Sequence, residues 1–201
     1  MKYTSDIAFT PTVKKIQEKK HSRSGYARME ESGGWQSEVT PQLENFLGTM
    51  DSFYLSTSNE EGQPYTQHRG GPKGFLKSID NKTLAFADYS GNRQYITVGN
   101  LSENNKAFIF LMDYLSKTRI KVWGTAKVVE DDKELLESLS DPSYKARLER
   151  VIVFTVEAWD VNCRKHIQQR FTAEDIEKIT DPLNERIKQL EILLAEKENS
   201  K

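Results

Sequence analysis

Between residues 51 and 171 the chain consists largely of short apolar runs that alternate with polar residues and end at turn residues. Alternation over four to eight residues is typical of half-buried β-strands. Strands are predicted at Ser52–Ser58, Gly62–His68, Phe75–Ile79, Thr83–Asp88, Lys106–Met112, Thr118–Glu130 and Val151–Val161. Because short turns join most of these runs and few helices intervene, the pattern favours an antiparallel barrel.

Helical signals lie around these runs. Thr10-Pro11 and Thr40-Pro41 each combine an N-cap hydroxyl with a proline at the first helical position, which predicts helices that begin there. Helical spacing also predicts a helix over Asn92–Leu101 and a short one over Asp131–Leu139. Residues 19–39 are polar and contain three glycines, so they are expected to be irregular.

The end of the chain has a different pattern. Its apolar residues follow one another at spacings of 3, 4, 4, 3 and 4, with charged residues between them: Ile176, Ile179, Leu183, Ile187, Leu190 and Leu194. This spacing predicts an apolar seam on one helix, or on two if Asp181-Pro182 starts a second. The seam is expected to pack on the barrel or on the tail of a second subunit.

The predicted organisation therefore has three parts: a helical lead-in at 1–50, a barrel at 51–171 and a helical tail at 172–201. The 29 basic and 30 acidic residues leave a net charge of −1, which does not favour a nucleic-acid or membrane surface. The single cysteine excludes an internal disulfide and fits a reducing compartment. Without an apolar leader or membrane span in the sequence, we expect a cytoplasmic protein.

Candidate binding residues lie near the first or last residues of predicted strands. Three basic segments stand there: Arg69-Gly70-Gly71-Pro72-Lys73, Gly91-Asn92-Arg93-Gln94 and Arg119-Ile120-Lys121. Cations, and backbone N–H groups that glycine leaves accessible, can bind one phosphate together. Each segment also has a plainer interpretation, as a glycine turn, a solvated arginine or a solvent-facing strand. The residues alone indicate a small β-rich domain with a basic anion site.

Other kinds of site find little support. Cys163 and His166 are two residues with metal-ligating side chains, and two ligands do not make a metal site. The sequence contains no Gly-x-Ser-x-Gly motif for a serine nucleophile and no Gly-x-Gly-x-x-Gly motif for a Rossmann nucleotide site.

The order of these segments, followed by Trp159-Asp160-Val161-Asn162-Cys163-Arg164-Lys165-His166, resembles the pyridoxamine 5′-phosphate oxidase-like split barrels, which hold flavin mononucleotide (FMN). The resemblance covers roughly Ser52 to Arg170. It implies a mainly β (α+β) fold, an antiparallel split β-barrel with peripheral helices and a C-terminal helical tail. It also implies a homodimer with FMN at the interface, since flavin lies between two barrels in this superfamily.

The resemblance further implies which residues bind the cofactor: His68, Arg69, Gly70, Lys77, Ala87, Asp88, Asn92, Arg93, Gln94, Arg119, Lys121, Trp159, Asn162 and His166. Arg69 and Lys77 would form the family's basic pair, although Lys73 is an alternative to Lys77. Arg119 or Lys121 would place a cation near the pyrimidine edge of the flavin. No catalytic residue and no metal ligand is assigned.

The resemblance leaves the reaction open. Extra residues between His166 and Arg170 and the long tail depart from the oxidases that use pyridoxamine phosphate, so the substrate is not predicted. The first expectation is an FMN-dependent oxidoreductase acting on a small organic substrate. The alternative is an FMN-binding protein without turnover, such as a flavin store, electron carrier or sensor. A barrel without flavin is disfavoured by Arg69, Asn92 and Arg93.

Overall fold

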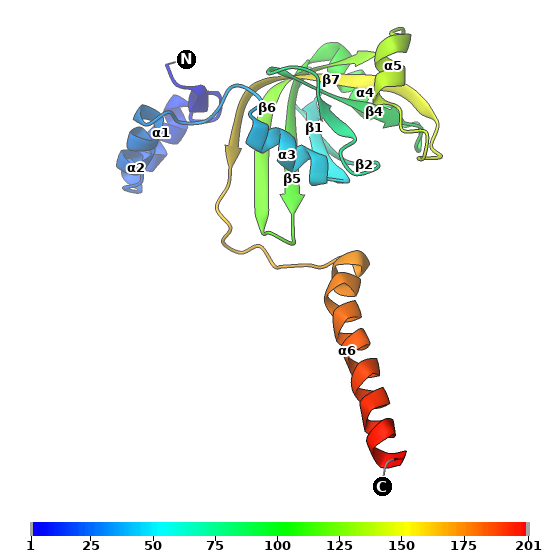
Figure 1. Ribbon diagram of the computed structural model, residues 1–201. Helices are drawn as coiled ribbons and strands as arrows, with labels where there is room; N and C mark the ends of the chain where they lie inside the picture. Colours follow the sequence, from blue (N-terminus) through cyan, green and yellow to red (C-terminus); the bar gives the residue numbers. More distant parts are fainter. Residues whose placement is uncertain (1, 200–201) are drawn as a thin grey trace. The chain divides into compact units, whose positions relative to one another are not determined.

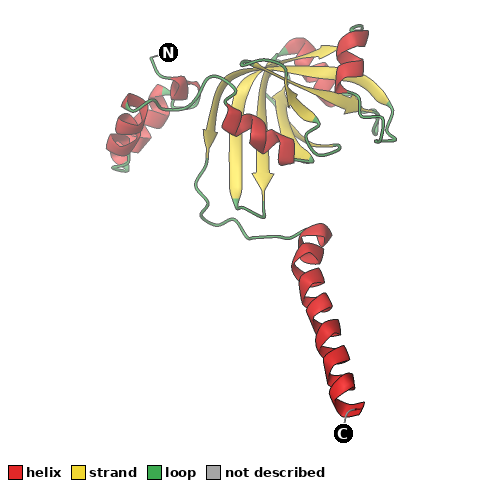
Figure 2. Ribbon diagram, in the orientation of Figure 1, coloured by secondary structure: helices red, strands yellow, loops and turns green. Residues whose placement is uncertain are grey.

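A computed structural model describes residues 2–199 and contains one seven-stranded antiparallel sheet (Figures 1 and 2). The strands are β1 Ser52–Ser58, β2 Pro64–Gly70, β3 Leu76–Ser78, β4 Thr83–Tyr89, β5 Lys106–Asp113, β6 Thr118–Val129 and β7 Leu148–Val161. Their order across the sheet is β2-β1-β5-β6-β7-β4-β3. The sheet is curled, and the prediction of a mainly β antiparallel split barrel with peripheral helices and a C-terminal helix is confirmed.

The chain forms two compact units. One extends to Met112 and resumes from Arg119 to Cys163, and we call it the barrel unit. The other joins Asp113–Thr118 to the chain from Arg164 onward, and we call it the tail unit. The barrel unit carries η1 Thr4–Ile7, α1 Pro11–Lys19, α2 Arg23–Glu31, α3 Pro41–Thr49, α4 Ile96–Glu103 and α5 Lys133–Leu139, and the tail unit carries α6 Ala173–Asn199.

The strand pattern follows from which faces are covered. In β1 the buried residues Phe53, Leu55 and Thr57 alternate with more exposed ones, as expected for a strand with one face on the core. In β4 five successive residues are buried. Phe86 belongs to the main core inside the curled sheet, whereas Ala87 packs in a second cluster with Leu139 of α5. The covered second face explains why β4 reads as an unbroken apolar run.

The two predicted proline-led helices are confirmed. Thr10 Oγ1 accepts a hydrogen bond from the Val13 backbone N–H at 3.2 Å, and α1 begins at Pro11. Thr40 caps α3 in the same way, with its hydroxyl 3.3 Å from the backbone nitrogen of Leu43. In both helices proline occupies a position whose N–H would have had no intrahelical partner.

The prediction that residues 19–39 are irregular is wrong, because Arg23–Glu31 form α2. The helix is held by a buried carboxylate that local sequence does not reveal. Glu30 accepts a hydrogen bond from the Ser5 hydroxyl at 2.8 Å and is paired with Arg23. Tertiary contacts of this kind override the weak helix propensity of a glycine-bearing segment.

The lead-in is tied to the sheet by the segment after α2. The rings of Trp35 and Trp123 stack with centroids 4.6 Å apart. Gln36 forms a β-bridge with Trp159, and the indole N–H of Trp159 donates to the backbone carbonyl of Glu38 at 2.7 Å. The lead-in and the sheet therefore belong to one compact unit.

The tail is one continuous helix, α6, with Pro182 inside it. The sequence left open whether the tail forms one helix or two, and the structure has one. No described residue of α6 is buried, and its apolar seam is exposed. Within residues 2–199, no helix combines the length and the apolar character needed to cross a membrane.

Candidate functional site

A cavity of about 180 Å³ lies in the barrel unit, between β2, the end of β4 and the start of α4. One wall comes from alternate residues of β2, namely Tyr65, Gln67 and Arg69. The rest of the lining comes from Asp88, Tyr89, Gly91–Val98 and Glu149. The cavity therefore contains five of the residues predicted to bind the cofactor: Arg69, Asp88, Asn92, Arg93 and Gln94.

The register of two strands builds an ion-pair cluster at this cavity. Asp88 on β4 lies directly opposite Arg150 on β7, because β4 and β7 pair antiparallel. Arg69 on β2 donates a hydrogen bond to Asp88 Oδ1, and Arg150 Nε lies 3.8 Å from Asp88 Oδ2. All three side chains are nearly buried, with 12% of Arg69, 11% of Asp88 and 9% of Arg150 exposed. One carboxylate thus serves two guanidinium groups.

Burial sets the charge balance of this cluster. Burial raises the pKa of the Asp88 carboxyl, and the positive charges of Arg69 and Arg150 act in the opposite direction. Burial likewise lowers the pKa of the Arg69 guanidinium, against the effect of Asp88. Because a buried charge is stable only when it is paired, Arg69 and Asp88 depend on each other, whereas Arg150 also pairs with Glu149 at 2.9 Å and with Glu130 at 3.4 Å.

Two donors of the cluster make no hydrogen bond, although Arg150 Nε is ion-paired with Glu130 at 3.4 Å. The Nε atoms of Arg69 and Arg150 are buried and have no hydrogen-bond partner among the described residues. An unsatisfied buried donor costs about 1–3 kcal/mol, more for a charged group. Arg69 lines the cavity, so its unmatched donor calls for an acceptor that the described residues do not supply.

The segment between β4 and α4 has an unusual backbone. Arg93 and Tyr95 adopt positive φ angles of 60° and 55°, a conformation that costs free energy in residues other than glycine. Arg93 Nε donates to the Tyr95 hydroxyl at 3.1 Å, and the Tyr95 ring lies 5.1 Å from the Arg150 guanidinium. Asn92 Oδ1 accepts from the backbone N–H of Gln94 at 3.2 Å. These contacts hold the strained turn that lines the cavity.

The prediction that a helix begins at Asn92 is wrong, because α4 begins at Ile96. The strained turn occupies the residues before it. The free backbone N–H groups of the first helical turn therefore belong to Ile96, Thr97 and Val98, which line the cavity. Thr97 also donates its hydroxyl proton to Gln67 Oε1 at 3.0 Å, which fixes α4 against β2.

Four predicted cofactor residues on β2, β3 and β4 do not line this cavity. His68 lies on the opposite face of β2 from Arg69, with its ring 5.6 Å from that of Tyr54, and Gly70 ends the same strand. Lys77 on β3 donates to the backbone carbonyl of Ser138 at 3.0 Å. The fourth, Ala87, packs in the cluster beneath α5. Their roles toward a cofactor stay predictions.

A second group of predicted residues meets at the paired ends of β6 and β7. Lys121 Nζ lies 3.3 Å from Asp160 Oδ2 and 5.1 Å from the ring centres of both Trp35 and Trp123. This ammonium group is therefore already paired with a carboxylate and lies over two indole rings.

The other members of the second group are also held by neighbours. Arg119 donates to the side-chain oxygen of Asn162 at 2.8 and 3.0 Å, in the amide orientation that satisfies both groups. Trp159 is buried in the main core. His166 belongs to the tail unit, where it is exposed and has a φ of 65°. The roles that the resemblance implies for these residues stay predictions.

Sequence reasoning missed several residues of the site. Tyr65, Gln67, Tyr95, Thr97 and Glu149 line the cavity without belonging to a basic segment. Arg150 was missed as well, although the sequence shows it beside Glu149, directly before the apolar run 151–154. Its importance depends on which residue of β4 lies opposite, and the sequence does not show that register.

Comparisons with known proteins identify a family. The family model described as pyridoxamine 5′-phosphate oxidase matches residues 39–163. No curated protein matches the sequence at a significant level. The matched region contains α3 to α5 and all seven strands of the sheet.

Similar solved structures include HupZ of Group A Streptococcus, with 15% identity, a TM-score of 0.48, and 66% of this chain and 99% of that chain covered. An FMN-binding protein from Syntrophomonas wolfei subsp. wolfei has 17% identity and a TM-score of 0.47, covering 74% and 96% of the two chains. A Clostridium acetobutylicum protein related to general stress protein 26 has 17% identity and a TM-score of 0.46, covering 67% and 94%.

The family match spans well over half of the 201 residues and includes β2, β4 and β7, the strands that carry Arg69, Asp88 and Arg150. The chain belongs to the pyridoxamine 5′-phosphate oxidase family.

Proposed function

We propose that this protein binds FMN and acts as an oxidoreductase on a small organic substrate. The observation that carries the proposal is the cavity at β2, β4 and α4, where Arg69 presents an unmatched buried donor beside Arg93. A terminal phosphate is a fitting acceptor, since it offers several oxygens and about −1.5 to −2 charges at neutral pH. Family membership supports the same ligand.

The residues of the cavity supply donors for a phosphate. Arg69 and Arg93 line it beside Asp88 and Glu149, and the nearby Arg150 is paired with Asp88, Glu149 and Glu130. The first turn of α4 adds backbone N–H groups, which favour an anion together with the helix dipole. We infer that Arg69, Asn92, Arg93 and this turn hold the FMN phosphate, and that Asp88 positions Arg69.

Bound FMN would supply the electron transfer, and the chain would bind and orient it. Within the chain, Asp88 holds the Arg69 guanidinium, and the strained turn holds Arg93 beside Tyr95. Arg119 and Lys121 stay candidates for the flavin's pyrimidine edge. We assign no catalytic residue.

We further propose that the flavin site is completed by a second copy of the barrel unit. The face of β1 and β5 that points away from the core carries aromatic side chains: Tyr54 lies opposite Phe110, and Phe108 packs 5.1 Å from Trp123. Tyr54 is 39% exposed. Aromatic residues of this kind are enriched at protein interfaces.

The bound chromophore tests the proposal directly. We expect the purified protein, or protein reconstituted with excess FMN, to release FMN on heating, as identified by chromatography. Release of FAD, or no flavin after reconstitution, would contradict the proposal. Anaerobic titration with NADPH, followed by flavin absorbance, then separates an oxidoreductase from a flavin store: a flavin that no reductant or substrate turns over favours the store.

Replacing Arg93 with alanine is expected to raise the Kd for FMN roughly tenfold to hundredfold, because the phosphate loses a charge-assisted hydrogen bond. Flavin fluorescence titration measures the change. The matched control is Arg28→Ala, which removes an exposed arginine on α2. Equal effects of the two substitutions would show that Arg93 has no special role.

A further inference from the structure

The seam of α6 is an apolar surface that the rest of the tail unit leaves exposed. Its six residues are each between 44% and 60% exposed: Ile176, Ile179, Leu183, Ile187, Leu190 and Leu194. A 27-residue helix with none of its residues buried gains no stability from packing, which is the main source of helix stability in proteins. A continuous apolar face of this kind marks an interaction surface.

The spacing of the seam fits a partner of the same shape. The intervals 3, 4, 4 repeat after eleven residues, so that Ile176 corresponds to Ile187, Ile179 to Leu190 and Leu183 to Leu194. An eleven-residue repeat keeps the apolar stripe almost parallel to the helix axis and gives a shallow right-handed supercoil between paired helices. The seam runs for about 27 Å along the helix. A second copy of α6 offers a stripe of the same length and curvature.

The charges beside the seam favour one direction. Arg186 and Glu191 flank the seam on opposite sides and lie five residues apart. In two parallel helices, flanking positions five residues apart face each other across the seam, so Arg186 meets Glu191 of the second copy, twice by symmetry. An antiparallel pair that keeps the same six residues in contact instead brings the two Arg186 side chains together. Opposite charges at these positions set the orientation of paired helices.

We propose that α6 is a dimerisation helix that pairs in parallel with α6 of a second chain through the seam Ile176–Leu194. The pairing uses residues outside the cavity of the barrel unit and does not depend on bound flavin. It gives the Arg186 side chain, which here donates to Gln189 at 3.2 Å, a carboxylate partner on the second copy.

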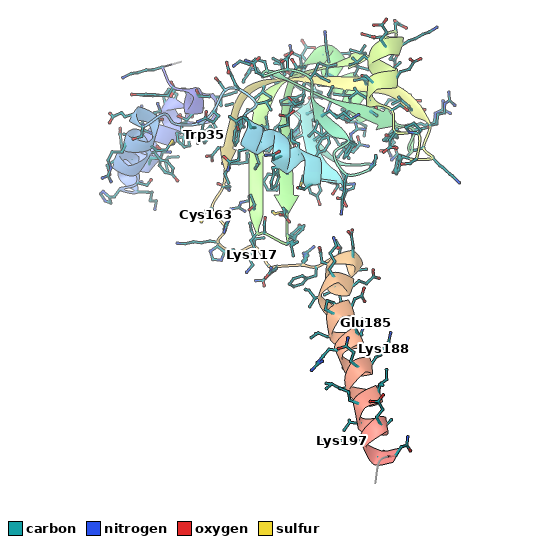
Figure 3. The ribbon with its side chains drawn as sticks, in the orientation of Figure 1. Trp35, Lys117, Cys163, Glu185, Lys188 and Lys197 are labelled. Atoms are coloured by element: carbon teal, nitrogen blue, oxygen red, sulfur yellow. The ribbon has the colours of Figure 1, made fainter. Side chains whose placement is uncertain are left out.

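Cysteine cross-linking of the full chain tests both the pairing and its direction. In a Cys163→Ser background, Leu190→Cys places one thiol in the seam, where a parallel pair brings the two copies close enough for a disulfide. The matched control is Glu185→Cys, which helical spacing places on the side of α6 opposite the seam. Figure 3 labels Glu185 on this helix. We expect at least about tenfold more cross-linked dimer from Leu190→Cys than from Glu185→Cys on mild oxidation.

Three results would overturn the proposal. Equal yields from the two variants would show random collision, and no cross-link from Leu190→Cys would show an antiparallel pair or a seam packed on its own barrel unit. In the Leu190→Cys background, Arg186→Glu is expected to lower the yield, and adding Glu191→Arg to restore it. Flavin content and circular dichroism, measured on the same samples, show whether the barrel is intact, and failure to restore the yield in intact protein would contradict parallel pairing.

Discussion

Replacing Asp88 with alanine is expected to lower the free energy of unfolding by about 3–5 kcal/mol, measured by urea denaturation without flavin. The substitution leaves the nearly buried guanidinium groups of Arg69 and Arg150 without the carboxylate that both now face. Arg150 would keep its ion pairs with Glu149 and Glu130, whereas the Arg69 guanidinium would lose its carboxylate in a poorly solvated site. Inorganic phosphate should stabilise this variant more than the unchanged protein, because the freed Arg69 gains an anion.

The control for this substitution is Asp131→Ala, which removes an exposed carboxylate just before α5. A surface change of this kind should alter the free energy of unfolding by less than about 0.5 kcal/mol. If Asp88→Ala costs no more than the control, the carboxylate does not hold the two arginines. Its proposed role in positioning Arg69 for a phosphate would then fall as well.

Gly124→Ala is expected to destabilise the protein by about 3 kcal/mol, because overpacking a full core costs typically 1–3 kcal/mol and here a rigid backbone atom stands in the way. A Cβ at this position would lie 1.9 Å from the Thr155 carbonyl oxygen and 2.7 Å from the Phe154 ring. Gly124 stands where the register between β6 and β7 shifts, after Trp123. The bulge therefore requires the absence of a side chain.

Gly99→Ala is the matched control for Gly124→Ala. Gly99 lies inside α4, and a Cβ there would meet no atom within 4 Å. Alanine has a higher helix propensity than glycine, so this variant should be as stable as the unchanged protein or more stable by up to about 1 kcal/mol. Thermal or urea denaturation of both variants gives the comparison. Similar losses of stability would show that the contacts of Gly124 are not the cause.

Much of the sheet was predictable because local chemistry and tertiary structure agree there. Asn59–Gly62 carries the turn residues of a hairpin, and β1 and β2 pair around it. Helices α1 and α3 begin at Pro11 and Pro41, where an N-cap hydroxyl followed by a proline predicts a helix start. In each case the signal and the structure it forms lie within about ten residues of each other.

The predictions that are wrong concern segments whose local structure is determined by residues far away in the sequence or by an unusual backbone conformation. Helix α2 depends on the buried Glu30 meeting Ser5, a partner 25 residues away. The start of α4 shifts to Ile96 because Arg93 and Tyr95 adopt left-handed conformations, which the helical spacing of Tyr95, Val98 and Leu101 does not reveal. Periodicity reports which face is apolar but not where the backbone turns.

The candidate site was predictable residue by residue but not as an arrangement. Arg69 and Arg93 stood out as basic residues beside glycine, yet β2 and β4 are far apart in the strand order, so the contact of Arg69 with Asp88 depends on the curl of the sheet. The sequence could have separated His68 from Arg69. Side chains alternate along a strand, so these two residues of β2 lie on opposite faces and cannot both line one cavity.

The hydrogen bond between Trp159 and Glu38 has a consequence for when the lead-in can fold during synthesis. The two residues are 121 positions apart in the chain, and Trp35 likewise stacks on a residue of β6. At about 5–20 residues per second, the ribosome needs roughly 6 to 24 s to add the strands on which the lead-in docks. During that time helices α1 and α2 have been made but the strands on which the lead-in packs have not. A chaperone that shields these helices would therefore act early, on the nascent chain.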